Sequence, residues 1–261
     1  MLTNPRHMIY TEFVKKNFEK TEKRIFNMQT KTKFFSLLTG NQLKIIALIA
    51  MTCDHVGFQL FPQYEILRWL GRLAFPIFAY MIAEGAKYTK NRLRYFLQMF
   101  GFGAICSVVY YVAMNSLYQC ILITFSLSIL LIYALDHAIQ TRKFENWLLF
   151  ALSFLAIFFL VEALPLLLED TDYGVDYGIW GVLTPVFVFL GMKKYQKLLL
   201  AVIPFTFLCF TGGLSMQWFA FAALLLLALY NGKRGKLKMK NLFYVYYPLH
   251  LVVIWAIGLF F

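Results

Sequence analysis

Charged residues are scarce in this 261-residue chain, and the shortage excludes a water-soluble fold. Asp, Glu, Lys and Arg make up 15% of the sequence, whereas hydrophobic residues make up 61% and the mean hydropathy is +0.64. Soluble domains carry roughly 25% charged and 45–50% apolar residues. The four cysteines have no regular spacing, which also excludes a secreted domain held by disulfides. The composition therefore predicts an all-α membrane protein with several spans.

Several sequence signatures of catalysis are also missing. The chain has no Gly-rich phosphate loop of the Walker type, no Gly-x-Ser-x-Gly elbow, and no His, Cys and Asp cluster at the spacing of metal ligands. We therefore expect neither a P-loop nucleotidase nor an α/β-hydrolase, and no bound metal.

Long apolar runs fill most of the sequence after residue 40. A helix needs about 20 largely apolar residues to cross a hydrocarbon core of about 30 Å. Nine runs predict a bundle of about nine spans, with eight or ten as open alternatives, and three of the runs are short. The expected spans are Leu43–Phe61, Ile66–Ala86, Tyr95–Met114, Ile121–Ala138, Trp147–Leu168, Ile179–Leu190, Leu198–Phe210, Trp218–Tyr230 and Leu242–Phe261.

The positions of the cations predict the orientation of these spans. Twenty-three of the 25 Lys and Arg residues lie in the first 44 residues or in alternate loops, and the other loops carry acids and no cation. Positive charge marks cytoplasmic loops, so we expect a cytoplasmic N-terminus and an extracytoplasmic C-terminus. The net charge of +12 then reports topology rather than nucleic-acid binding. Residues 1–40 are interpreted as a basic cytoplasmic leader and residues 41–261 as the membrane domain.

A few ionisable residues fall inside the expected spans, where they are costly and often functional. At 1.5 Å per helical residue, Asp54, His55, Arg72 and Glu162 share a layer near the middle of the bilayer, with His250 somewhat closer to the cytoplasm. Because adjacent helical residues point about 100° apart, we expect Asp54 to pair with Arg72 and His55 to face a cavity. An imidazole at this depth titrates near neutral pH.

The alternative interpretation is that these groups only fix helix packing. For Asp54, Arg72 and His250 the packing and functional interpretations are equally supported. For Glu162 the packing interpretation is preferred. His250 follows Pro248, where a bent helix can open a cavity.

Six sequence blocks in the same order resemble the TraX family from about Asn41 to Phe261. They are Leu43–Leu48 with Asp54-His55-Val56-Gly57, Gly71–Phe78 with Ala83-Glu84-Gly85, Asp176-Tyr177-Gly178 with Gly181, Gln217–Ala220, Tyr230–Gly235, and Phe243-Tyr244 with Tyr247–Leu251. The resemblance implies a protein of the inner membrane that acetylates the N-terminus of a conjugative pilin. The family is in turn similar to polytopic acyltransferases that modify extracytoplasmic sugars.

This resemblance implies an acyl-CoA-dependent membrane acetyltransferase, with acetyl-CoA as donor and an extracytoplasmic peptide or glycan as acceptor. His55 would be the general base or an acylated intermediate, and Arg72 would stabilise the oxyanion or anchor an acidic acceptor. Asp54, paired with Arg72, would be the third catalytic residue. Basic residues would bind the CoA phosphates, and three further residues would support the site. The expected cofactor-binding residues are Lys44, Arg92, Arg94, Lys233 and Arg234, and the supporting residues are Glu84, Asp176 and His250.

Two other functions fit the same residues. A small transporter or channel could use a buried Asp–Arg–His layer as a proton or solute relay. A membrane scaffold without catalysis, such as an assembly factor, is the third hypothesis.

Overall fold

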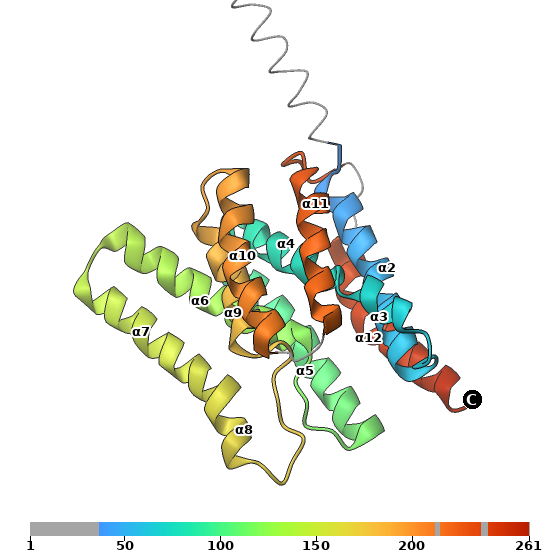
Figure 1. The fold of residues 1–261 in the computed structure, drawn as a ribbon. Helices are drawn as coiled ribbons and strands as arrows, with labels where there is room; N and C mark the ends of the chain where they lie inside the picture. Colours follow the sequence, from blue (N-terminus) through green and yellow to red (C-terminus); the bar gives the residue numbers. More distant parts are fainter. Residues whose placement is uncertain (1–36, 212–214, 236–239, 261) are drawn as a thin grey trace, which may run out of the picture.

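The computed structural model describes residues 37–211, 215–235 and 240–260, and these form a bundle of helices (Figure 1). In these residues the β contacts are two isolated bridges, Leu38 to Tyr230 and Gln119 to Val175. The expected all-α class is confirmed for the described chain, whereas residues 1–36 of the expected leader lie outside it. The elements are α2 (Gly40–Gln59), α3 (Glu65–Gly71), α4 (Ala74–Tyr88), α5 (Arg92–Met114), α6 (Ile121–Thr141), α7 (Phe144–Phe158), the π-helical turn η1 (Phe159–Ala163), α8 (Leu164–Leu167), α9 (Gly178–Leu190), α10 (Lys194–Thr211), the 3-10 helix η2 (Ser215–Phe221), α11 (Ala222–Ala228) and α12 (Lys240–Gly258).

Within the described residues each expected apolar run is mainly helical, with a break at Arg72 and Leu73, and the runs differ in length. Four stretches of the described residues are long and apolar enough to cross a membrane: Glu65–Tyr88, Arg92–Met114, Ile121–Thr141 and Phe144–Leu167. Three shorter apolar helices cover Gly178–Leu190, Met216–Ala228 and Val245–Gly258, and α2 and α10 belong to neither group. The helices are compatible with a membrane protein, and the count of nine spans stays a prediction.

The core of the bundle is formed mainly by α2, α4, α6 and α9, whose buried side chains make two apolar clusters. By contrast, α7 buries Ile157 alone and α5 buries Met99, Gly103 and Cys106. Many of the other apolar side chains of these outer helices are exposed, whereas some pack against the two clusters. A helix that is apolar on all sides and yet peripheral is typical of contact with lipid.

Hydrogen bonds join the ends of the helices in two groups. The Gly40 N–H donates to the Lys233 carbonyl at 2.8 Å, and Lys194 Nζ donates to the Ala228 carbonyl at 2.7 Å, which joins basic segments. The Leu117 N–H donates to Asp172 Oδ1 at 2.8 Å, which joins two loops without cations. Figure 1 places the two groups at opposite ends of the bundle. This arrangement agrees with the alternation of charge along the sequence.

Candidate functional site

Helices α2 and α3 approach each other closely because two glycines lie between them. A Cβ at Gly57 would lie 2.7 Å from Leu67 Cβ, and one at Gly71 would lie 2.6 Å from Asp54 Cγ, both closer than real Cβ contacts. Glycine is therefore required at both positions for this packing. The approach brings the carboxylate of Asp54 against the turn that joins α3 to α4.

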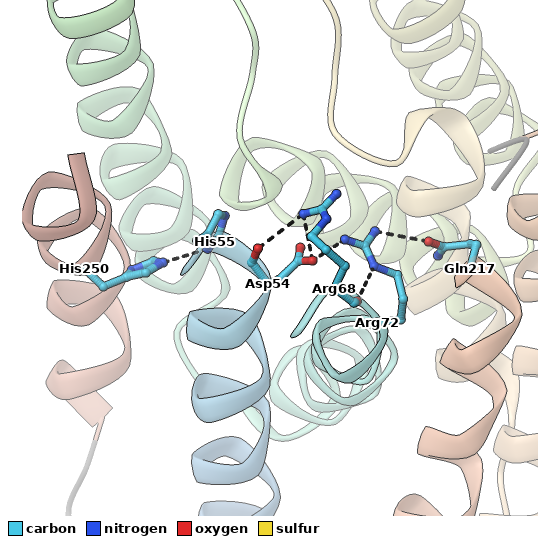
Figure 2. Close-up of polar contacts among 6 residues, drawn as sticks. All are labelled: Asp54, His55, Arg68, Arg72, Gln217 and His250. Atoms are coloured by element: carbon cyan, nitrogen blue, oxygen red, sulfur yellow. Dashed lines mark hydrogen bonds and ion pairs between the residues drawn. The ribbon is translucent and has the colours of Figure 1, made fainter. Parts of the chain in front are cut away.

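Asp54 binds two arginines through one carboxylate oxygen (Figure 2). Arg68 Nη1 donates to Asp54 Oδ1 at 2.8 Å and to the Asp54 carbonyl at 3.4 Å, and Arg72 Nη2 donates to the same Oδ1. The expected pair of Asp54 and Arg72 is confirmed. Arg68 is an additional partner; its position four residues before Arg72 on one helical face is the sequence signal for it.

The guanidinium group of Arg72 is fixed by several hydrogen bonds. Its Nε donates to the Arg68 carbonyl at 3.3 Å and its Nη1 donates to Gln217 Oε1 at 3.3 Å, so each guanidinium nitrogen has an acceptor. The residue is 8% exposed and lies at the break between α3 and α4. Gln217, on η2, stands in one of the sequence blocks named above but was not expected in the site. These contacts leave Arg72 little freedom to move toward a ligand.

His55 faces α12 and contacts His250. His55 Nδ1 lies 3.0 Å from His250 Nε2, and the ring centroids are 4.9 Å apart. His250 Nδ1 lies 2.9 Å from the Tyr246 carbonyl, and the Tyr246 ring stacks on the His250 ring. His250 is buried and His55 is half-buried. The Nδ1 side of His55 is thus occupied by a second imidazole, where the sequence predicted an open cavity.

The loop before α9 places Asp176 on another side of the arginines. Tyr118 donates its hydroxyl to Asp176 Oδ1 at 3.0 Å, and Arg72 and Asp54 are near enough for their charges to act on the carboxyl. Burial raises the pKa of Asp176 to about 6, while Tyr118 and Arg72 oppose the rise. Next to it, Tyr177 has a left-handed backbone (φ 61°) and stacks on Phe75 with centroids 4.0 Å apart. A strained residue beside buried charges is common at functional sites.

A basic group gathers at the start of α2. The Gly40 and Asn41 N–H groups donate to the carbonyls of Lys233 and Arg234, which fixes the Gly-Lys-Arg-Gly turn beside the helix. Lys44 lies near enough to Arg234 for their charges to interact. Three of the five expected cofactor-binding residues are therefore neighbours, and the N-terminus of α2 adds its partial positive charge.

The other expected residues lie outside these two groups. Arg92 pairs with Asp136 of α6, and Arg94 is exposed at the start of α5. Glu84 pairs with Lys197 of α10 rather than with the group around Asp54. Glu162 Oε1 accepts from the Ile179 N–H at 2.8 Å at the start of α9, which confirms the packing role expected for it.

Comparison with known proteins agrees with the sequence blocks. A family model described as "TraX protein" matches residues 39–258. The chain is 25% identical over 253 residues to the "probable fimbrial assembly protein FimC, serogroup H1" of Dichelobacter nodosus, a match that covers 84% of this chain and 95% of that protein. It is 44% identical over 52 residues to the "uncharacterized protein RP591" of Rickettsia prowazekii (strain Madrid E), or 20% of this chain and 19% of that one. No solved structure matches the chain. Because the family model matches most of the sequence, the chain belongs to the TraX family.

Proposed function

We propose that this protein is a multi-pass acyltransferase of the inner membrane that moves an acetyl group from cytosolic acetyl-CoA to an extracytoplasmic amine or hydroxyl. The observation that carries the proposal is the position of His55, which is half-buried on α2, hydrogen-bonded to a second histidine, and adjacent to an aspartate with two arginines. A base and a group of cations side by side are what acyl transfer from a thioester needs.

The basic group at the start of α2 supports the donor side of this proposal. Lys44, Lys233 and Arg234 can bind phosphate groups through charge-assisted hydrogen bonds. His55 follows Lys44 by eleven residues on one helix, which corresponds to a rise of about 16 Å. CoA carries its phosphates at one end and its thioester at the end of a long flexible arm. Phosphates at the basic group would therefore direct the thioester along α2 toward His55.

In the reaction, His55 removes a proton from the acceptor amine or hydroxyl as its nitrogen or oxygen attacks the thioester carbon. The C–S bond then breaks, and the CoA sulfur leaves as a thiolate that takes up a proton. Arg68 is the better candidate for contact with the developing oxyanion, because among the described residues its Nη2 has no acceptor, whereas Arg72 is fully engaged. A second route first acylates His55 and then passes the group to the acceptor.

The preferred acceptor of the acetyl group in this proposal is a peptide amine. The similarity to a protein named for fimbrial assembly supports a peptide N-terminus, such as that of a pilus subunit, ahead of a glycan. Asp176 and Tyr118, which lie in the loops without cations, would then line the path of the acceptor.

Purified protein in detergent provides the test. Acetyl-CoA should raise the temperature of unfolding and should be hydrolysed slowly, and His55→Ala should abolish turnover while the shift in unfolding temperature remains. His137→Ala, an exposed histidine on α6, is the matched control and should behave as wild type. Absence of any effect of saturating acetyl-CoA, or equal turnover in His55→Ala, would refute the proposal.

A transporter is the second candidate, and the two buried ion-pair groups, Asp54 with its arginines and Glu84 with Lys197, favour it. Protein reconstituted in vesicles with a pH-sensitive dye distinguishes the two functions. Proton flux that Asp54→Asn abolishes, with no response to acetyl-CoA, would replace the acyltransferase by a transporter.

A further inference from the structure

We infer that His250 is a positioning residue: it fixes the proton of His55 on Nδ1 and thereby leaves the lone pair of His55 on Nε2. The inference deepens the proposed function and rests on it for its catalytic meaning, because it states which nitrogen of His55 acts as the base. The tautomer itself follows from contacts that do not depend on the reaction.

The hydrogen of His250 lies on its Nδ1. Its Nδ1 lies 2.9 Å from the Tyr246 carbonyl oxygen. A carbonyl oxygen has no proton and can only accept, so Nδ1 of His250 must carry a hydrogen and donate it. A neutral imidazole has one N–H, and the second nitrogen is an acceptor. Nε2 of His250 is therefore an acceptor.

The hydrogen of His55 also lies on its Nδ1. The acceptor Nε2 of His250 lies 3.0 Å from Nδ1 of His55, so Nδ1 of His55 must be the donor. His55 then has its hydrogen on Nδ1 and an unprotonated Nε2. His55 thus donates to His250, and His250 donates to the Tyr246 carbonyl. Both imidazole rings are neutral in this arrangement. Arg68 and Arg72 are bound to Asp54, the residue before His55 on α2, so their charges oppose a further positive charge on His55.

The packing around His250 keeps this chain of hydrogen bonds in place. The residue is 5% exposed, and the Tyr246 ring lies parallel to its ring at a centroid distance of 5.3 Å. The Tyr246 hydroxyl and Thr52 Oγ1 are 2.7 Å apart, with Thr52 three residues before His55. Helices α2 and α12 are thus joined twice within one turn, which fixes the orientation of both imidazoles.

A neutral partner has a chemical consequence. In serine hydrolases an aspartate orients the catalytic histidine and stabilises its protonated form. Here the orienting group is an uncharged imidazole, and the nearby carboxylate of Asp54 is bound to the arginines instead. His250 selects the tautomer of His55 and carries no negative charge. A negative charge at this position would favour the protonated form of His55 before the acceptor arrives. His55 therefore remains a free base in the resting protein.

A pair of variants tests the inference. His250→Gln keeps an acceptor at the position of Nε2, whereas His250→Met has the same length and no comparable acceptor. We expect His250→Met to lower kcat on the order of 100-fold or more, as loss of the correct tautomer does elsewhere, and His250→Gln to recover most of that loss. Equal activity of His250→Met and wild type, or equal loss in both variants, would overturn the inference.

Nitrogen NMR of the histidine rings gives a readout that does not need activity. The chain has four histidines, and a His55→Gln sample identifies the signals of His55. Wild type and His250→Gln should show the Nδ1–H tautomer of His55, and His250→Met should shift it toward Nε2–H. An Nε2–H tautomer in wild type would refute the inference. If the NMR result holds and no variant transfers acetyl groups, the proposed function fails while the tautomer assignment stands.

Discussion

Replacing Gly71 by Ala tests the close approach of α2 and α3 on which the Asp54 group depends. The new Cβ would lie 2.6 Å from both Cγ and Oδ1 of Asp54, whereas contacts under 3.0 Å are essentially never seen for real Cβ atoms. Asp54 has little room to retreat, because both Arg68 and Arg72 bind its Oδ1. The strain must therefore separate the two helices or displace the carboxylate from the arginines.

The expected cost follows from these two responses. Overpacking of a filled interior costs about 1–3 kcal/mol, and loss of a hydrogen bond to a charged group costs about 1.5–3 kcal/mol. Because the structure relaxes by the cheaper route, we expect a destabilisation of about 1–3 kcal/mol. Gly101→Ala on α5 is the matched control, since nothing lies within 4 Å of its Cβ position. Alanine is the better helix former by about 0.5–1 kcal/mol, so this control should stabilise the protein.

The assay is thermal unfolding in one detergent at one scan rate, followed by tryptophan fluorescence. A change of 1 kcal/mol corresponds to about 2–4 °C in Tm for a protein of this size. Gly71→Ala should lower Tm by several degrees, and Gly101→Ala should leave it unchanged or raise it slightly. A Gly71→Ala protein as stable as wild type, or two shifts of the same sign, would show that the close approach does not govern stability.

Three further predictions concern other buried or capping groups. Burial raises the pKa of Asp176 from the usual 3.8 to about 6. The contribution of this carboxyl to the free energy of unfolding is therefore complete below about pH 4, where it is protonated, and falls by up to about 3 kcal/mol as the pH rises through 6. Tm measured against pH should show this fall in wild type and in the control Asp172→Asn, an exposed carboxyl whose pKa lies below its usual value, but not in Asp176→Asn. Lys197→Met leaves Glu84 buried without its partner and should cost about 3–5 kcal/mol in thermal unfolding, and adding Glu84→Gln should recover part of it. Glu162→Leu removes the acceptor at the start of α9 and should cost about 1–2 kcal/mol in the same assay, whereas Glu162→Gln keeps the oxygen and should cost less.

The helices and one ion pair could be predicted from the sequence because both depend on local rules. Apolar runs fix where helices form, since an unpaired backbone is costly away from water. Counting 1.5 Å per residue then placed Asp54 and Arg72 at similar depth, and the structure joins them. Glu162 was counted at the same depth, but the structure places its carboxylate at the start of α9.

The contact between His55 and His250 could not be obtained by the same counting. The sequence started the last helix at Leu242 and placed His250 about 6 Å from His55 in depth. In the structure α12 begins at Lys240 and α2 at Gly40, and helices in the bundle are inclined to one another (Figure 1). Depth counted along straight parallel helices does not include this inclination. Contacts between distant helices depend on it.

The break between α3 and α4 was missed for a different reason. Hydropathy predicts one continuous span over Ile66–Ala86, and both helices are apolar enough to support it. The helix is interrupted at Arg72 and Leu73, where the chain forms a turn. The Arg72 N–H donates both to the Arg68 carbonyl at 3.3 Å and to the Trp69 carbonyl at 3.1 Å, so the backbone tightens into a turn at this point, and Arg72 Nε adds a bond to the Arg68 carbonyl. Hydropathy counts apolar residues and does not report such a turn.

The neighbours of Asp54 and His55 explain how one helix can separate two chemical tasks. Successive residues of α2 point about 100° apart, so Asp54 faces the arginines of α3 and its C-terminal turn while His55 faces α12. If both residues faced one neighbour, the carboxylate would compete for the imidazole and hold a proton on it. Because the arginines engage the carboxylate, His55 is left to an uncharged partner. In the proposed reaction the two arginines would therefore act on the base in two ways: their charge opposes its protonation, and they keep the only adjacent carboxylate on α2 away from it.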